Sequence, residues 1–184
     1  MTPEVVIVGT IEEAAGWVER AAPRVLVVAG GTTPLPLYRA LRLPWDEVAI
    51  YPGDERADGS NLRAIRGAFD ARARVRELGE DLPVPDLLLL GMGEDGHTAS
   101  LFPGSPALGE TVRRVVRAGD RTTITPVVIA EAKRIAVLVS GARKGPMLRR
   151  VLHDPPDPVL LPAQLALRGT WFVDRAAAAA SEVA

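Results

Sequence analysis

His97 is the side chain best suited to acid–base chemistry, because it follows Asp95 by two residues in the glycine-rich segment GMGEDGH. Imidazole titrates near pH ~6.5, so at neutral pH it can accept a proton from a reacting group. The alternative is a structural histidine that is hydrogen-bonded to its own loop. The other histidine, His153, ends a predicted helix just before DPPDP, where a capping or surface role is favoured.

The same segment spaces Gly91, Gly93 and Gly96 as G-x-G-x-x-G, which is the fingerprint of a dinucleotide-binding loop. Here the spacing occurs in the middle of the chain, and no acidic residue ends a strand about 20 residues later, as that fingerprint requires. The following residues, HTASLFPG, contain a proline that would end any helix. A turn that presents His97 is the better interpretation.

A second glycine-rich segment, AGGTTP, is a candidate anion site. Gly30 and Gly31 would let backbone N–H groups approach a ligand closely, and Thr32 and Thr33 stand where a helix is predicted to begin. Free N–H groups and a helix N-terminus attract phosphate. An ordinary strand-to-helix turn with a threonine N-cap explains this segment equally well.

Two cations could hold a phosphate. Arg56, in the segment GDER, offers a planar guanidinium fork, although for an isolated GDER a surface ion pair with Asp54 or a neighbouring acid is the favoured alternative. Lys144, four residues after Ser140 in SGARK, lacks the surroundings of a nucleotide P-loop and would act as a point charge or remain a solvated lysine.

These segments all follow predicted strands. Short apolar runs without helical spacing are typical of strands buried on both faces of a parallel sheet; they occur at Val5–Val8, Val25–Ala29, Val48–Tyr51, Leu87–Leu90, Ile135–Val139 and Trp171–Val173. Helical patterns lie between most of them, at Ile11–Ala21, Leu37–Leu41, Leu62–Leu78, around Met147–Leu152 and at Ala176–Ala180. The alternation predicts an α/β domain with helices on both faces of the sheet. Ligands bind outside the carboxyl ends of such strands, so the polar loops should converge on one crevice.

The composition narrows the possible functions. The chain has 184 residues, a formal net charge of −1, 17 glycines, 16 prolines and no cysteine. The charge balance argues against binding nucleic acid through an overall basic surface. The absence of cysteine excludes disulfides, thiolate zinc sites and cysteine nucleophiles. No metal-binding motif, basic leader or membrane-length apolar run is present, so we expect a single domain over residues 1–184 in the cytoplasm, without metal or membrane contact.

Taken together, the loops resemble those of the 6-phosphogluconolactonases. GGTTPLPLYRAL resembles their GGSTPxxLY, GDER with the following SN resembles their GDER…SN, and LLLLGMGEDGHTASLFPG is close to their signature LLGMGxDGHTASLFPG. RTTIT, SGARK and WFVDRAA resemble their R-x-T-x-T, G-x-x-K and W-x-x-D-x-A-A segments in the same order. The segment after Arg56 and the stretch from Phe69 to Pro85 are shorter than is usual in that family.

The resemblance implies a three-layer α/β/α Rossmann-like sandwich with a mostly parallel sheet. It also implies hydrolysis of 6-phosphoglucono-1,5-lactone to 6-phosphogluconate without a cofactor, in the oxidative pentose phosphate pathway. His97 would be the general base that activates water, and Asp95 would orient it. The phosphate and the sugar acid would be bound by residues of five segments, namely Gly30, Gly31, Thr32, Thr33, Asp54, Arg56, Gly93, Arg121 and Lys144.

Two other functions stay open at this stage. A related deaminase of glucosamine 6-phosphate shares the GxDGH segment, but typically continues IAFNEP where this chain has TASLFPG. A non-catalytic sensor of sugar phosphates would need the anion site but not the base, so the presence of both Asp95 and His97 argues against it. The only partner expected is a small phosphosugar lactone. The oligomeric state stays open, with a monomer slightly favoured.

Overall fold

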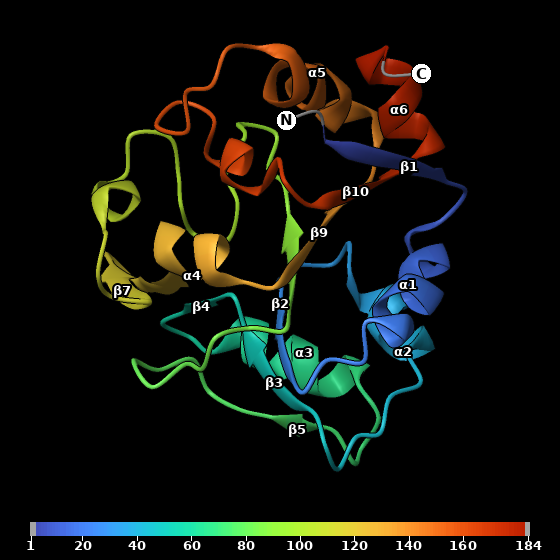
Figure 1. Cartoon of the computed structure of the whole chain (residues 1–184), viewed down its shortest axis with the longest axis vertical. Coiled ribbons are helices and arrows are strands. Elements are labelled where there is room, and N and C mark those ends of the chain that lie inside the picture. The colour runs from blue at the N-terminus through green and yellow to red at the C-terminus, as the bar shows by residue number, and fades with distance from the viewer. Residues whose placement is uncertain (1–2, 183–184) are drawn as a thin grey trace.

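A seven-stranded parallel sheet forms the centre of the protein, as the computed structural model of residues 3–182 shows (Figure 1). Its order across the sheet is β1 (Glu4–Val8), β10 (Thr170–Asp174), β9 (Arg134–Val139), β6 (Leu87–Gly91), β2 (Val25–Val28), β3 (Ala49–Pro52) and β5 (Arg74–Val75). Every neighbouring pair is parallel. The predicted fold class is thus confirmed. Among the described residues, no helix has the length and apolar character needed to cross a membrane.

Helices cover both faces of this sheet. One face carries η1 (Ile11–Ala14), α1 (Ala15–Arg20), α2 (Leu35–Ala40) and α3 (Ser60–Ala68). The other carries α4 (Pro126–Glu131), α5 (Gly145–His153), η4 (Pro162–Ala166) and α6 (Arg175–Ser181). Side chains alternate between the two faces, so that Leu87 and Leu89 of β6 join the first layer while Leu88 and Leu90 join the second.

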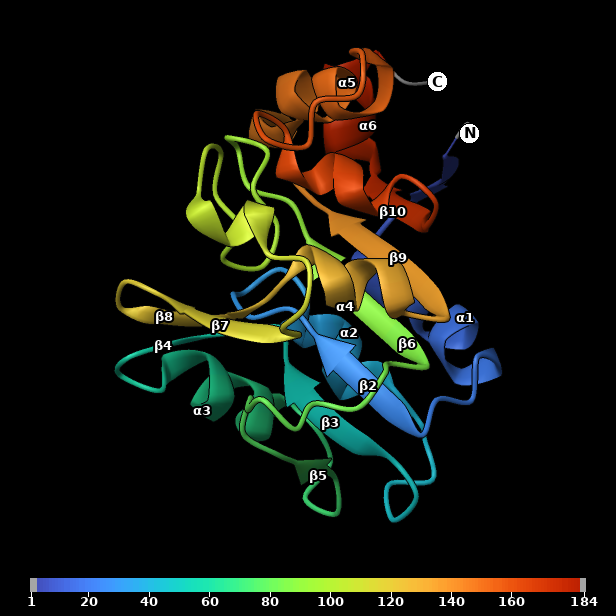
Figure 2. The same cartoon turned by 60° about the vertical axis from the view of Figure 1, so that its left-hand side comes forward.

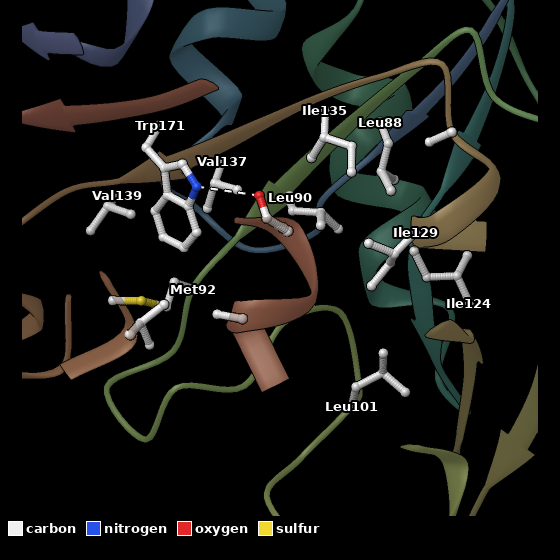
Figure 3. Close-up of a cluster of buried hydrophobic side chains, with 14 of the residues drawn as sticks. Leu88, Leu90, Met92, Leu101, Ile124, Ile129, Ile135, Val137, Val139 and Trp171 are labelled. Carbon is white, nitrogen blue, oxygen red and sulfur yellow. Dashed lines mark hydrogen bonds between the residues drawn. The ribbon is translucent and has the colours of Figure 1, made fainter. Parts of the chain in front are cut away.

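Trp171 of β10 is the largest fully buried side chain in the second layer. It packs among Leu90, Val137 and Val139, and its indole N–H donates to the carbonyl of Ala166 at 3.3 Å (Figure 3). The single polar atom of the ring is therefore satisfied, which makes burial of such a large apolar surface favourable. This core fixes β9 and β10, whose carboxyl ends lead into the site described below.

A small antiparallel sheet, which the sequence did not predict, lies beyond the carboxyl end of β3. It contains β4 (Asp54–Arg56), β8 (Arg121–Ile124) and β7 (Val115–Ala118), in the order β4-β8-β7 (Figure 2). The last three residues of GDER therefore form a strand, which only Gly53 separates from β3. In the register of the small sheet, Asp54 pairs with Thr123, and Arg56 pairs with Arg121.

Two predictions of local structure were wrong in part. The predicted helix over Leu62–Leu78 ends at Ala68, because Phe69 turns to extended backbone and packs its ring against Tyr38 and Trp45. The next residues return to the sheet as β5, paired with β3. In addition, β1 is an edge strand that is not buried on both faces, since Ile7 is 48% exposed.

Candidate active site

A cavity of about 600 Å³ opens at the carboxyl edge of the large sheet. Figure 2 shows the arrowheads of β2 and β9 pointing toward this edge. All nine predicted binding residues line the cavity together with His97, and the wall is completed by Ala29, Pro34, Asn61, Leu90, Gly91, Met92, Glu94, Ala99 and Leu138. The structure therefore brings together residues from five segments that are far apart in the sequence.

His97 and Asp95 form a hydrogen-bonded pair at the cavity. Asp95 Oδ1 lies 2.5 Å from His97 Nδ1 and also accepts the His97 backbone N–H at 3.1 Å. When the ring is neutral and Nδ1–H donates to the carboxylate, Nε2 carries no hydrogen and is the nitrogen that can accept a proton. Partial burial raises the pKa of Asp95, but the hydrogen bonds from His97 outweigh it and leave that pKa below its usual value. Asp95 therefore stays ionised beside the ring.

The loop that carries this pair is folded tightly on itself. Gly93 N–H donates to the carbonyl of His97 at 2.9 Å, and the Thr98 hydroxyl donates to the carbonyl of Gly91 at 2.8 Å. Gly96 has a φ of +84°, which favours glycine. No helix follows between residues 92 and 105, so the G-x-G-x-x-G spacing lacks the helix that dinucleotide binding requires.

Gly93 is needed for space rather than for backbone freedom. A Cβ atom at this position would overlap the His97 ring and lie 2.6 Å from Asp95 Oδ1. We predict that Gly93→Ala displaces the pair and lowers any reaction that depends on it by about 100-fold. Gly67→Ala is a matched control, since a Cβ there meets nothing within 4 Å. Full activity of the Gly93 variant, together with an unchanged melting temperature, would contradict this role of Gly93.

Asp54 is an interior anchor of the site. Its side chain is only 9% exposed, and its two oxygens accept hydrogen bonds from Ser100 Oγ at 2.6 Å and Asn61 Nδ2 at 3.1 Å. Arg121 Nη1 lies 3.7 Å from Oδ2. Burial raises the pKa of Asp54, and the Ser100 hydrogen bond and Arg121 only partly oppose this rise. The carboxyl oxygens are thus occupied by protein groups.

Phe102 contacts both Arg121 and His97. The Arg121 guanidinium lies 5.4 Å from the centre of the Phe102 ring, and that ring centre lies 4.6 Å from the centre of the His97 ring. A cation over an aromatic face is held by the quadrupole of the ring. Sequence reasoning missed Phe102, Ser100 and Asn61. The signal for the first two was their place in HTASLFPG, directly after the histidine.

The AGGTTP loop is shaped differently from the expectation. Gly30 packs against Asn61, whose side chain a Cβ would overlap, whereas Gly31 has a φ of +82° and open space beside it. The threonine N-cap of the alternative interpretation does not form, because α2 begins at Leu35 with Pro34 as its N-cap. Proline fixes its own φ near the helical value and so starts this short helix without a side-chain cap.

Lys144 and Arg56 line the cavity from two different elements. Arg56 ends β4 of the small sheet and is exposed. Lys144 ends η3 (Ala142–Lys144), directly before α5, and is half-buried. Burial lowers the pKa of Lys144, and the charges of Glu94 and Asp174 oppose this change. Among residues 3–182, no three His, Asp or Glu side chains gather as ligands of a metal ion would.

The fold and the cavity define an α/β protein with several cations beside a histidine–carboxylate pair. The sequence profile described as glucosamine-6-phosphate isomerases/6-phosphogluconolactonase matches residues 57–173. The chain belongs to this family.

Individual relatives agree with that assignment. The chain is 34% identical over 199 residues to a 6-phosphogluconolactonase of Synechocystis sp., with 83% of this chain and 82% of the relative covered. It is 40% identical over 135 residues to one of Rattus norvegicus, of which the match spans 49%, with 67% of this chain covered. The crystal structure of a 6-phosphogluconolactonase from Shewanella baltica superposes with a TM-score of 0.82 at 27% identity, covering 94% of this chain and 97% of that one.

Proposed function

We propose that this protein hydrolyses 6-phosphoglucono-1,5-lactone to 6-phosphogluconate, a step of the oxidative pentose phosphate pathway. The observation that carries the proposal is the His97–Asp95 pair, which opens on the same cavity as Arg56, Arg121 and Lys144. A base beside a set of cations suits a substrate that has a phosphate at one end and a reactive ester at the other. The relatives that carry this name support the choice of substrate.

His97 is the general base of the proposed reaction. Nε2 takes a proton from water as the water oxygen attacks the lactone carbonyl carbon, and Asp95 stabilises the imidazolium that forms. The tetrahedral intermediate then collapses with cleavage of the bond between the carbonyl carbon and the ring oxygen. The imidazolium returns its proton to the departing ring oxygen, which becomes the hydroxyl group of the open-chain product. The new carboxylic acid loses its own proton to solvent.

Arg56 and Lys144 bind the phosphate of the proposed substrate, with Arg121 and the Gly30–Thr33 loop beside them. Guanidinium and ammonium groups form charge-assisted hydrogen bonds with phosphate oxygens. Because Lys144 is half-buried, its charge is less screened by water than that of an exposed lysine. The largely buried Asp54 supports this arrangement through its contacts with Arg121 and Asn61.

The direct test is a coupled assay with freshly generated 6-phosphogluconolactone, in which the rate of spontaneous hydrolysis is subtracted. The purified protein should accelerate hydrolysis well above that background. Turnover at the background rate, with 6-phosphogluconate still bound, would overturn the proposal in favour of a sugar-phosphate sensor.

Removing either proposed phosphate ligand should weaken binding more than chemistry. Arg56→Ala and Lys144→Ala are each expected to raise KM about 10- to 100-fold, since a charge-assisted hydrogen bond contributes about 1.5–3 kcal/mol. The melting temperature should stay near that of the wild type. Arg117→Ala is the matched control, because Arg117 is an exposed arginine of β7 outside this cavity. An unchanged KM with a lower melting temperature would make Arg56 or Lys144 a structural residue instead.

A further inference from the structure

Asp174 lies at the carboxyl end of β10 and takes no direct part in the proposed chemistry. Its Oδ1 accepts the backbone N–H of Ala177 at 2.7 Å, so the side chain is the N-cap of α6. A cap of this kind stabilises the first turn of a helix. On this contact alone, Asp174 would be a purely local structural residue.

The other oxygen of Asp174 reaches a different segment. Oδ2 accepts hydrogen bonds from the Ser140 hydroxyl at 2.6 Å and from the Gly141 backbone N–H at 2.9 Å. Both residues directly follow β9, the neighbour of β10 in the sheet. Gly141 has a φ of +97°, which directs the chain from the strand into η3. One carboxylate therefore joins the start of α6 to the start of the η3 segment.

Lys144 is the last residue of that segment, and its position is fixed from both sides. Its backbone N–H donates to the carbonyl of Gly141 at 3.0 Å, which ties it to the Asp174 anchor. On the other side, Gly145 packs so closely against Ala180 of α6 that a Cβ atom would overlap it. The segment from Ser140 to Gly145 thus contacts both the N-cap residue of α6 and the helix itself, and Lys144 lies at the cavity beside the second contact.

The charge of Asp174 also favours a charged Lys144 at the cavity. Partial burial raises the pKa of Asp174, but hydrogen bonds from Ser140 and from backbone N–H groups outweigh it and leave that pKa below its usual value. The ionised carboxylate helps keep the half-buried Lys144 charged.

We propose that Asp174 is a positioning residue that holds Lys144 in the cavity through Ser140 and Gly141, and so sets the affinity for the phosphate group of the ligand without touching it. This inference rests on the proposed function, because it takes Lys144 as a phosphate ligand.

The test is a double-mutant cycle, with 6-phosphogluconate binding measured by calorimetry. Asp174→Asn removes the charge, and Ser140→Ala removes one anchoring bond while the α6 cap stays intact. Each is expected to weaken binding about tenfold in the wild-type background. In a Lys144→Met background neither should weaken it further, because the residue being positioned is gone. In the lactone assay, each should raise KM and leave kcat within a few-fold of the wild-type value.

The matched control is Asp86→Asn. Asp86 accepts the backbone N–H groups of Arg24 and Val25 and pairs with Lys133, but it precedes β6 and so lies at the amino edge of the sheet. Its loss should lower the melting temperature and leave 6-phosphogluconate affinity unchanged. If Asp174→Asn does not fold, Ser140→Ala carries the same cycle.

Two outcomes would separate failure of the inference from failure of the proposed function. If Asp174→Asn and Ser140→Ala weaken binding equally with and without Lys144, their effect is general and Asp174 is not a positioning residue for Lys144. If Lys144→Met alone leaves 6-phosphogluconate binding unchanged, the assignment of Lys144 in the proposed function is wrong, and the inference fails with it.

Discussion

Replacing His97 with alanine is expected to lower the enzyme-catalysed rate of lactone hydrolysis about 100-fold or more, while 6-phosphogluconate binds almost as in the wild type. The reason is geometric: Nδ1 of His97 is committed to Asp95, and Nε2 remains to take a proton from water. The phosphate would be held by cations on other loops, so affinity for the product should survive. The measurement is the assay with freshly generated lactone, together with calorimetric titration of 6-phosphogluconate.

His153→Ala is the matched control for this experiment. His153 is the other histidine of the chain and lies exposed at the end of α5, so its removal should leave turnover unchanged. Asp95→Asn is a milder variant of the same pair, because the amide keeps the size of the side chain but removes the charge that stabilises the imidazolium. Unchanged turnover in the His97 variant would exclude this residue as the base and leave the site without its proposed mechanism.

The loops of the site were predictable because glycines and apolar strands mark them in the sequence. Parallel strands buried on both sides read as short apolar runs, and the polar residues that follow them must meet at one edge of the sheet. This reasoning led to His97 and Asp95 in one loop and to Lys144 in another. The structure brings all three to one edge of the sheet. His97 and Lys144 line the cavity, and Asp95 is hydrogen-bonded to His97.

The small antiparallel sheet was not predictable in the same way. Its strands are short and mostly polar, with sequences such as DER and RTTI, and lack the apolar runs that predicted the large sheet. The partners of Asp54 were hidden for a related reason. Ser100 is 46 residues away in the chain and Asn61 is seven, and no local pattern indicates a contact that the fold alone creates.

The contacts of Asp54 lead to the second large effect. Asp54→Ala is expected to lower the free energy of unfolding by about 3 kcal/mol, because Ser100 and Asn61 lose a hydrogen-bond acceptor and Arg121 loses an ion-pair partner in a largely buried place. For a chain of this size that corresponds to a drop in melting temperature of about 6–12 °C. Asp120→Ala, an exposed carboxylate in the turn between β7 and β8, should cause little change. A melting temperature within about 1 °C of the wild type in the Asp54 variant would contradict this role.

The pH dependence of the same residue gives an independent check. Since burial raises the pKa of Asp54, the folded protein holds its proton to a higher pH than the unfolded chain does. The stability that Asp54 contributes is therefore largest below the ordinary pKa of an aspartate and decreases as pH rises through the raised value. Asp54→Asn cannot titrate and lacks this dependence of stability on pH.

Urea unfolding of both proteins between pH 4 and pH 7 should show the stability of the wild type relative to Asp54→Asn falling with pH. A difference that instead grows with pH would mean that Asp54 is stabilised as the ion, with Arg121 as the stronger influence on its charge.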